Sequence, residues 1–378
     1  MSNSSAQFEG SQLQPGFKVL VVSAAEAESH VPSPVRGNAF WNQFNPRRFA
    51  AYRIEETTKG NVFYVAIPFR AEANLTILHF RVAYEVAQQY LEKNAEAVAR
   101  TENPPLLKII EDNKEWAAGA LWFMEYTKSD LGSQGNSQAG DYSEVAMTFT
   151  ATDHGRHEVT GKGKYTGASV LATSNFPTIT AKLLVNNWAA IVGGRAVGGF
   201  DKHAAEVEMT TTERGVRTAA RHLDGKQLFA IEIPKVGTCE SLNNQIRLLR
   251  QKARLFGLWT VLSATVKMTL RMIPGLRNLL TADRCDGYTT LRPPFPGMPR
   301  RYRLDSDMNP WSVKFGELNS DDITDGIDAG DEMFGALLKN AEFETSLRAQ
   351  FRGTFGPAES GVDWLRSRVN SSHKNDKR

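Results

Sequence analysis

The chain has 378 residues, of which 41% are hydrophobic, and its formal net charge is +3. A charge this small for this length gives no general case for nucleic-acid binding, and the length permits a substantial core. Only two cysteines occur, Cys239 and Cys285, which excludes a disulfide framework and fits no metal-binding spacing. Neither a signal peptide nor an apolar run of about 18 residues is found. We therefore expect a cytoplasmic protein that does not associate with membranes.

Strands dominate the expected structure of the first two-thirds of the chain. A disordered tail is expected over 1–15, and a flexible loop, which could act as a rim or lid, over 127–143. The expected strands and helix are as follows: strands over 61–69, 75–81, 118–126 and 144–152, a helix over 82–96, and strand-like stretches within 155–169 and 205–234.

The last third of the chain has a different character. Residues 240–283 carry seven lysines and arginines with no acidic residue between them, which indicates a long basic helix. Such a helix packs on the core or at a subunit contact with its arginines in water, or it binds anionic lipids; we favour the first interpretation. Residues 16–310 are expected to form the main domain, 311–369 a helical C-terminal extension, and 370–378 a disordered tail.

The segment that ends at Lys202 is the most informative in the chain. The run 188–192 is apolar and reads as a buried strand, and four glycines follow it within 193–199. Glycines allow positive φ and close approach of other parts of the chain. An amine must be neutral to attack a carbonyl, and burial favours the neutral form of a lysine. We therefore predict that Lys202 is a reactive amine.

Five segments around and before this lysine occur in an order typical of one enzyme family. They are Ala190–Arg195 with Phe200–Lys202, then Gly140–Glu144 and, more weakly, Leu121–Glu125 and Leu75–Arg81. The first pair resembles the Gly-Arg and aromatic-Pro-Lys-Lys signature of the acetoacetate decarboxylase family. The second resembles its Gly-x-Tyr-Thr-Glu element, and the others its strands. The resemblance covers roughly residues 60–235.

This resemblance implies a fold and a set of roles. It implies an α+β fold around a closed antiparallel β-barrel with surrounding helices, and assembly as a homo-oligomer. Lys202 would form a Schiff base with a keto acid. Glu144 would act on the proton taken up at carbon or orient the substrate, and Glu125 would be a second active-site carboxylate.

The chain departs from the family pattern beside the lysine. His203 stands where the family has a second lysine, and Asp201 stands where it has proline. We expect the activation of Lys202 to depend mainly on desolvation. His203 is a candidate cation or proton carrier, with a loop-capping role as the alternative.

No arginine aligns with the arginine that binds substrate in the family. The nearest candidates for holding a substrate carboxylate are Arg70 and Arg195. Arg195 has an equally weighted alternative, which is to brace the glycine turn through backbone carbonyls.

The function expected from the sequence is decarboxylation of a β-keto acid through a Schiff base at Lys202, without a metal or an organic cofactor. The first alternative keeps the Schiff base but makes the chain an aldolase, dehydratase or cyclase. The second is a non-catalytic small-molecule-binding or assembly protein. The length beyond the family core favours a specialised substrate, as in secondary metabolism.

Overall fold

The structure is a computed structural model. The residues that it describes are 16–30, 50–67, 69–134, 141–152, 158–160, 177–213, 215–234, 283–291, 301–308, 314–317 and 334–357. The two predicted tails, the tip of the predicted loop and almost all of the predicted basic helix lie outside these ranges.

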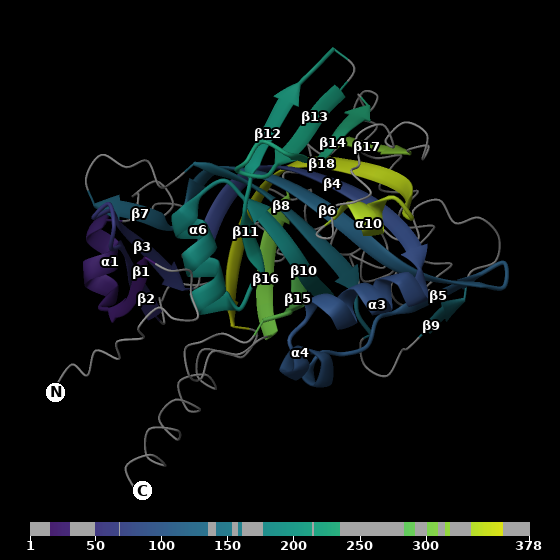
Figure 1. The fold of residues 1–378 in the computed structure, drawn as a ribbon, viewed down its shortest axis with the longest axis horizontal. Helices are drawn as coiled ribbons and strands as arrows, with labels where there is room; N and C mark the ends of the chain where they lie inside the picture. The colour runs from purple at the N-terminus through teal and green to yellow at the C-terminus, as the bar shows by residue number, and fades with distance from the viewer. Residues whose placement is uncertain are drawn as a thin grey trace, which may run out of the picture.

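A large mixed sheet of 11 strands forms the centre of the molecule (Figure 1). Its longest strands are β4 (Phe69–Ala83), β6 (Lys114–Ser129) and β18 (Glu342–Pro357), with β4 antiparallel to both of the others. The remaining strands are β5 (Lys108–Glu111), β8 (Tyr142–Thr150), β9 (Glu158–Thr160), β10 (Thr178–Val185), β11 (Lys202–Ala204), β15 (Asp283–Thr289), β16 (Arg301–Met308) and β17 (Lys314–Glu317).

The pairings of β8 connect β6 and β10, two strands that are distant from each other along the rest of the large sheet. β8 pairs with β6 on one side and with β10 on the other, and the pairings then continue through β15, β16, β18 and β4 to β6. β10 pairs in parallel with β11 and β15, and β5 in parallel with β9. The expectation of a purely antiparallel sheet is therefore wrong at these pairs, because a crossover rather than a hairpin joins β10 to β11.

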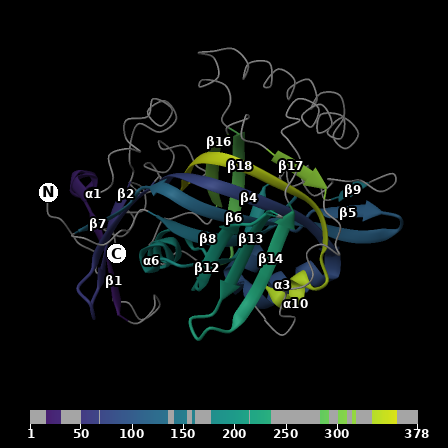
Figure 2. The same cartoon turned by 90° about the horizontal axis from the view of Figure 1, so that it is seen from above.

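Two smaller sheets flank the large one (Figures 1 and 2). One consists of β1 (Phe17–Val22), β2 (Ala50–Glu56), β3 (Val62–Ile67) and β7 (Leu131–Gln134), with α1 (Ala24–His30) against it. The other consists of β12 (Glu206–Thr211), β13 (Gly215–Arg221) and β14 (Gln227–Pro234). Part of the predicted loop 127–143 is thus the strand β7, whose Leu131 is buried and lines the central cavity.

The predicted helical extension over 311–369 is wrong where the structure describes it. Residues 342–357 form β18, which lies between β4 and β16 inside the large sheet. Leu347, Phe351 and Phe355 pack in the same apolar cluster as Ile77, the alternation of a strand that packs one face on a core. Phe343 packs with Phe80 in the cluster on the opposite face, because the register shifts between Phe343 and Thr345. Among the described residues of this segment, the one helix is α10 (Gly335–Leu338).

Most of the elements expected in the first part of the chain are confirmed. The expected strands within 61–152 correspond to β3, β4, β6 and β8, and the expected helix 82–96 is α3 (Tyr84–Asn94), followed by α4 (Ala97–Glu102). The stretch 205–234 holds β12, β13 and β14. In the part of the chain that the structure describes, no helix is long and apolar enough to cross a membrane.

Both faces of the long strands are covered, and this produces two apolar clusters. Leu78, Phe80 and Val82 of β4 pack in a cluster with α3, α10 and the three-stranded sheet. Leu75 and Ile77 point to the opposite face and join a second cluster that includes β3, β7 and the helix after β10. The second cluster surrounds the cavity described next.

Candidate active site

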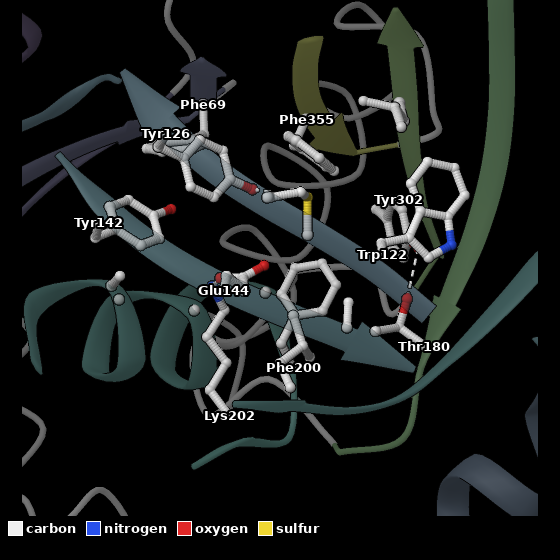
Figure 3. A pocket seen from close by; sticks show the side chains of 18 of the residues that line it. Phe69, Trp122, Tyr126, Tyr142, Glu144, Thr180, Phe200, Lys202, Tyr302 and Phe355 are labelled. Atoms are coloured by element: carbon white, nitrogen blue, oxygen red, sulfur yellow. Dashed lines mark hydrogen bonds and ion pairs between the residues drawn. The ribbon is translucent and has the colours of Figure 1, made fainter. Parts of the chain in front are cut away.

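An apolar cavity lies on the inner face of the strands that form the pairing circuit (Figure 3). It encloses about 1090 Å³, counted together with its opening to solvent. Strands β4, β6, β8, β10, β16 and β18 each contribute side chains to it, and β3, β7 and the segment 189–200 close its sides. Because part of this space is open to solvent, a small molecule can enter the cavity.

Lys202 and Glu144 meet at the wall of this cavity. The Lys202 Nζ lies 2.5 Å from the Glu144 Oε2, and both residues are buried, with exposed fractions of 7% and 3%. Glu144 comes from β8 and Lys202 from β11, the two strands that pair with β10 near its end. They are the only charged side chains among the described residues that line the cavity. Two of the residues proposed from the sequence thus lie in contact in the wall of one cavity.

A short helix positions the lysine. Residues 188–192, expected to be a strand, belong to α6 (Trp188–Gly193), which continues into the π-helical turn η2 (Gly194–Gly198). Asn187 caps α6, because its side-chain oxygen accepts a hydrogen bond from the Ala190 N–H. A five-residue apolar run does not distinguish a helix from a strand by periodicity. The asparagine before the run is the signal that indicates a helix.

Two glycines in this turn have separate structural reasons. Gly199 ends η2 with φ 69°, a left-handed conformation that glycine adopts without strain. At Gly194, a Cβ atom would lie 2.5 Å from the Cε and 2.6 Å from the Cδ of Lys202. The absence of a side chain at Gly194 therefore gives the lysine its place in the cavity wall.

We expect the substitution Gly194→Ala to displace the Lys202 side chain from Glu144. A shift of about 1 Å in a reacting group can cost roughly 10²-fold in rate, so capture of a carbonyl compound by the amine should fall by about that factor. Gly198→Ala is the matched comparison, because its Cβ would meet the Phe200 ring instead of the lysine. The rate of adduct formation with acetylacetone measures both, and equal losses in the two variants would contradict this role of Gly194.

Asp201 organises a charged cluster outside the cavity lining. Its Oδ2 lies 3.2 Å from the Lys182 Nζ, and its Oδ1 lies 2.9 Å from the His203 Nε2 and 3.8 Å from the Arg195 Nη1. Burial acts to raise the pKa of Asp201, but the hydrogen bond and charge of His203 and the charge of Lys182 outweigh it, so the pKa is lowered. Asp201 is thus paired with residues other than Lys202.

The lowered pKa of Asp201 predicts a contribution to stability at neutral pH that acid removes. The carboxylate ionises at lower pH in the folded than in the unfolded chain, so this contribution is complete above a pH of about 4 and is lost as the pH falls through the folded value. Asp201→Asn should lower the free energy of unfolding at neutral pH. It should also make that free energy fall less steeply as the pH drops below about 4. Urea unfolding at a series of pH values measures this, and parallel curves for the two proteins would contradict it.

Four residues proposed from the sequence do not line the cavity. Glu125 is exposed, accepts a hydrogen bond from Asn74 at 3.1 Å, and alternates with Met124 and Tyr126, which do line it. Arg70 is buried in an ion pair with Asp130, with Nε to Oδ2 at 2.6 Å.

The last two of these residues, Arg195 and His203, lie beside the backbone of the lysine. Arg195 donates a hydrogen bond to the Lys202 carbonyl at 2.9 Å, which is the bracing contact weighed as its alternative role. His203 contacts Asp201 as described above. The structure thus brings Lys202 and Glu144 together and places the other four candidates elsewhere.

Two tyrosines near the pair were not identified from the sequence as site residues. The rings of Tyr126 and Tyr142 stack with centroids 4.3 Å apart, and both line the cavity beside Glu144 (Figure 3). Burial raises the pKa of each phenol well above its ordinary value, and the charge of Glu144 adds to the effect. Both phenols therefore keep their protons at neutral pH. Their positions, two residues from Met124 and two from Glu144, put them on the same strand faces as those residues.

The cavity has a second group of polar atoms away from the lysine. The Trp122 Nε1 donates to the Thr148 Oγ1 at 2.9 Å, and the hydroxyls of Thr180 and Tyr302 are 2.7 Å apart. Thr148 and Thr180 are directly paired across β8 and β10. In the described part of the chain, no group of three or more histidine, cysteine or acidic side chains has the arrangement of a metal site.

Comparison with known proteins gives likenesses in structure only. No family model matches the sequence, and no curated protein matches it. An acetoacetate decarboxylase from Legionella pneumophila aligns over 77% of this chain and 85% of its own, with 10% identity and a TM-score of 0.44. The enduracididine biosynthesis enzyme MppR, complexed with the condensation product of pyruvate and imidazole 4-carboxaldehyde, aligns over 76% and 86%, with 13% identity and a TM-score of 0.37. An acetoacetate decarboxylase-like enzyme from Sphingomonas wittichii RW1 aligns over 76% and 90%, with 11% identity and a TM-score of 0.35.

Proposed function

We propose that the chain is a Schiff-base enzyme that decarboxylates a β-keto acid at Lys202. The observation that carries this proposal is the buried contact between the Lys202 Nζ and the Glu144 carboxylate in the wall of an apolar cavity. A buried lysine and carboxylate in a cavity that can hold a small molecule supply both a nucleophile and a group that moves its proton.

The first step is the release of the amine. Glu144 takes a proton from the Lys202 ammonium, which leaves a neutral amine and a neutral carboxylic acid. This transfer becomes easier as the site excludes water, because two neutral groups lose less solvation in an apolar site than two charges. The amine then attacks the ketone carbon. The resulting carbinolamine takes the proton back from Glu144 as its hydroxyl leaves as water, which gives an iminium ion and restores the Glu144 carboxylate.

The second step is the loss of carbon dioxide. The bond from the α-carbon to the carboxylate breaks, and its electron pair moves into the iminium to form an enamine. Glu144 takes up a proton from solvent and delivers it to that carbon, and water hydrolyses the new iminium to the ketone and the Lys202 ammonium. No cation other than Lys202 is present among the lining residues that the structure describes. A substrate carboxylate is therefore poorly stabilised there, which favours its departure as neutral carbon dioxide.

A second candidate keeps the iminium and changes the reaction to an aldol-type condensation, dehydration or cyclisation. The protonated phenols of Tyr126 and Tyr142 favour it, because each can give a proton to an alkoxide that forms beside Glu144. In this case the enamine attacks a second carbonyl instead of taking up a proton.

Borohydride reduction tests the proposal. The protein is incubated with acetoacetate and with longer β-keto acids, reduced, digested and analysed by mass spectrometry, while carbon dioxide is measured in parallel. We expect a substrate-dependent adduct on Lys202 together with release of carbon dioxide. An adduct without carbon dioxide would select the aldol-type candidate, and no adduct on any lysine would leave a non-catalytic binding protein.

The scaffold and its assembly are proposals of the same kind. The circuit of strand pairings supports a closed barrel as the frame of the cavity. We also propose that the chain is cytoplasmic and that it assembles as a homo-oligomer. Sedimentation of the purified chain tests the assembly.

A further inference from the structure

The cavity has two chemically different ends. Figure 3 shows Tyr126, Tyr142, Glu144 and Lys202 toward one side, and Trp122, Thr180 and Tyr302 toward the other. The first end carries the charged pair, and the second carries neutral hydroxyl and indole groups.

Strand geometry gives the distance between the two ends. Glu144 and Thr148 both face the cavity from β8 and are separated by four residues. At about 3.3 Å per residue, this separation is roughly 13 Å along the strand. A molecule that reaches from the amine to Thr148 must therefore be several carbon atoms longer than acetoacetate.

The wall between the ends is apolar. Ala146 lies between Glu144 and Thr148 on β8, Leu183 is its partner on β10, and Phe200 lies between the two ends of the cavity (Figure 3). A chain or ring of carbon and hydrogen fits this middle section, whereas a second charge placed there would lose its hydration without a partner.

The polar end has fixed geometry. Gly287 pairs with Tyr302 across β15 and β16, and a Cβ on Gly287 would lie 2.0 Å from the Tyr302 Cζ. The glycine thus leaves the space in which the phenol lies. Thr148 accepts the Trp122 N–H and directs its own proton toward the Ala120 carbonyl at 3.4 Å. A hydroxyl oxygen has two lone pairs, so the Thr148 oxygen has capacity for one further donor.

We propose that the substrate is an elongated β-keto acid whose largely apolar tail ends in a hydroxyl group held by Thr148 and Thr180. This inference rests on the proposed function for the reactive head of the molecule. It adds the tail, which the Lys202–Glu144 pair alone does not specify. Thr148, Thr180 and Tyr302 are then specificity-determining residues at the far end of the site.

Three β-diketones test the proposal, because a β-diketone condenses with a neutral lysine amine, with loss of water, to a stable enaminone that absorbs in the near ultraviolet. The probes are acetylacetone, octanoylacetone and octanoylacetone with a terminal hydroxyl. The longer chain should lower the half-saturating concentration by about 10- to 100-fold. The terminal hydroxyl should lower the half-saturating concentration further. In a purely apolar cavity the hydroxyl would raise this concentration instead.

Matched variants connect these gains to the residues. Thr148→Val and Thr180→Val keep the side-chain shape and should remove the gain from the terminal hydroxyl, a change of about 5- to 10-fold. Ala146→Leu fills the middle of the cavity and should reduce the ratio between the half-saturating concentrations of acetylacetone and octanoylacetone. Thermal unfolding of each variant verifies that it is folded.

The outcomes separate this inference from the proposed function. Capture of acetylacetone at Lys202 with equal affinity for all three probes would overturn the elongated substrate and leave the Schiff base intact. Capture of no probe would overturn the Schiff base.

The tail is then tested without the amine, by displacement of the dye anilinonaphthalene sulfonate from the Lys202→Met/Glu144→Gln variant. Equal displacement by acetylacetone and octanoylacetone, or displacement unchanged by Ala146→Leu in the same background, would overturn the elongated site as well.

Discussion

Replacing Lys202 with methionine is expected to lower the rate of decarboxylation by about 10³-fold or more, because it removes the nucleophile and with it the covalent route. Methionine has a similar length and no amine. The variant should also give no borohydride adduct. The measurement is carbon dioxide release from a β-keto acid at saturating concentration, corrected for the spontaneous reaction in buffer.

The same substitution is expected to destabilise the protein, and this requires a second variant. Lys202→Met leaves Glu144 buried without its cation, a loss of about 3–5 kcal/mol for a broken buried pair. Lys202→Met/Glu144→Gln removes both charges and should recover most of that free energy of unfolding. Activity should be absent from both variants, so a folded and inactive double variant separates chemistry from stability.

Lys128→Met is the control for the lysine experiment. Lys128 lies on β6, its side chain is 46% exposed, and it pairs with Glu72 at the surface. An exposed pair of this kind contributes roughly 0–1 kcal/mol. The control should keep the adduct and the activity. If Lys202→Met and Lys128→Met had equal activity, the Schiff base at Lys202 would be excluded.

The part of the fold that the sequence predicted best is the part with strong local patterns. The expected strand 75–81 and the helix after it correspond to β4 and α3 because alternation and helical periodicity are visible within a few residues. The strand predicted over 188–192 is wrong, because this run is short and apolar on every side, a pattern shared by buried strands and buried helices. Only the capping interaction of Asn187 distinguishes the two.

The C-terminal segment shows a different reason for error. Residues 347–355 alternate as a strand should, but the partners of this strand on β4 lie more than 250 residues earlier, from Phe69 to Arg81. Long-range pairing of this kind is invisible to a reading that follows the chain locally. The extension expected to be added outside the domain therefore lies inside the large sheet.

The geometry of the candidate site was predictable where a short motif marked the residue, and not where strand register decided the direction of a side chain. Lys202 and Glu144 were identified from short segments, and they lie 2.5 Å apart. Glu125 was identified in the same way, yet one residue along a strand reverses the direction of a side chain. The register of β6 points Met124 and Tyr126 into the cavity and Glu125 out of it. A difference of one position thus decides which carboxylate reaches the amine.

Glu144→Gln is expected to separate the two halves of the proposed reaction. Glutamine keeps the shape of the side chain and removes its charge, so an ammonium at Lys202 would be buried without a partner carboxylate. The neutral amine is then favoured, and capture of acetylacetone should persist. Turnover should nevertheless fall by about 10²–10⁴-fold, the usual contribution of a positioned acid–base group, because no carboxylic acid remains to protonate the enamine carbon.

Glu125→Gln is the matched control for this experiment, since it removes a carboxylate from the neighbouring strand on the side away from the cavity. Steady-state release of the ketone product and the near-ultraviolet absorbance of the enaminone are measured for both variants. Loss of capture together with turnover in Glu144→Gln would mean that the carboxylate is needed to free the amine as well as to protonate the enamine. Unchanged turnover in Glu144→Gln, or an equal loss in Glu125→Gln, would contradict the assignment of the proton to Glu144. Because one variant tests the contact at 2.5 Å and the other the alternation of a strand, the pair connects the predicted chemistry directly to the register of β6 and β8.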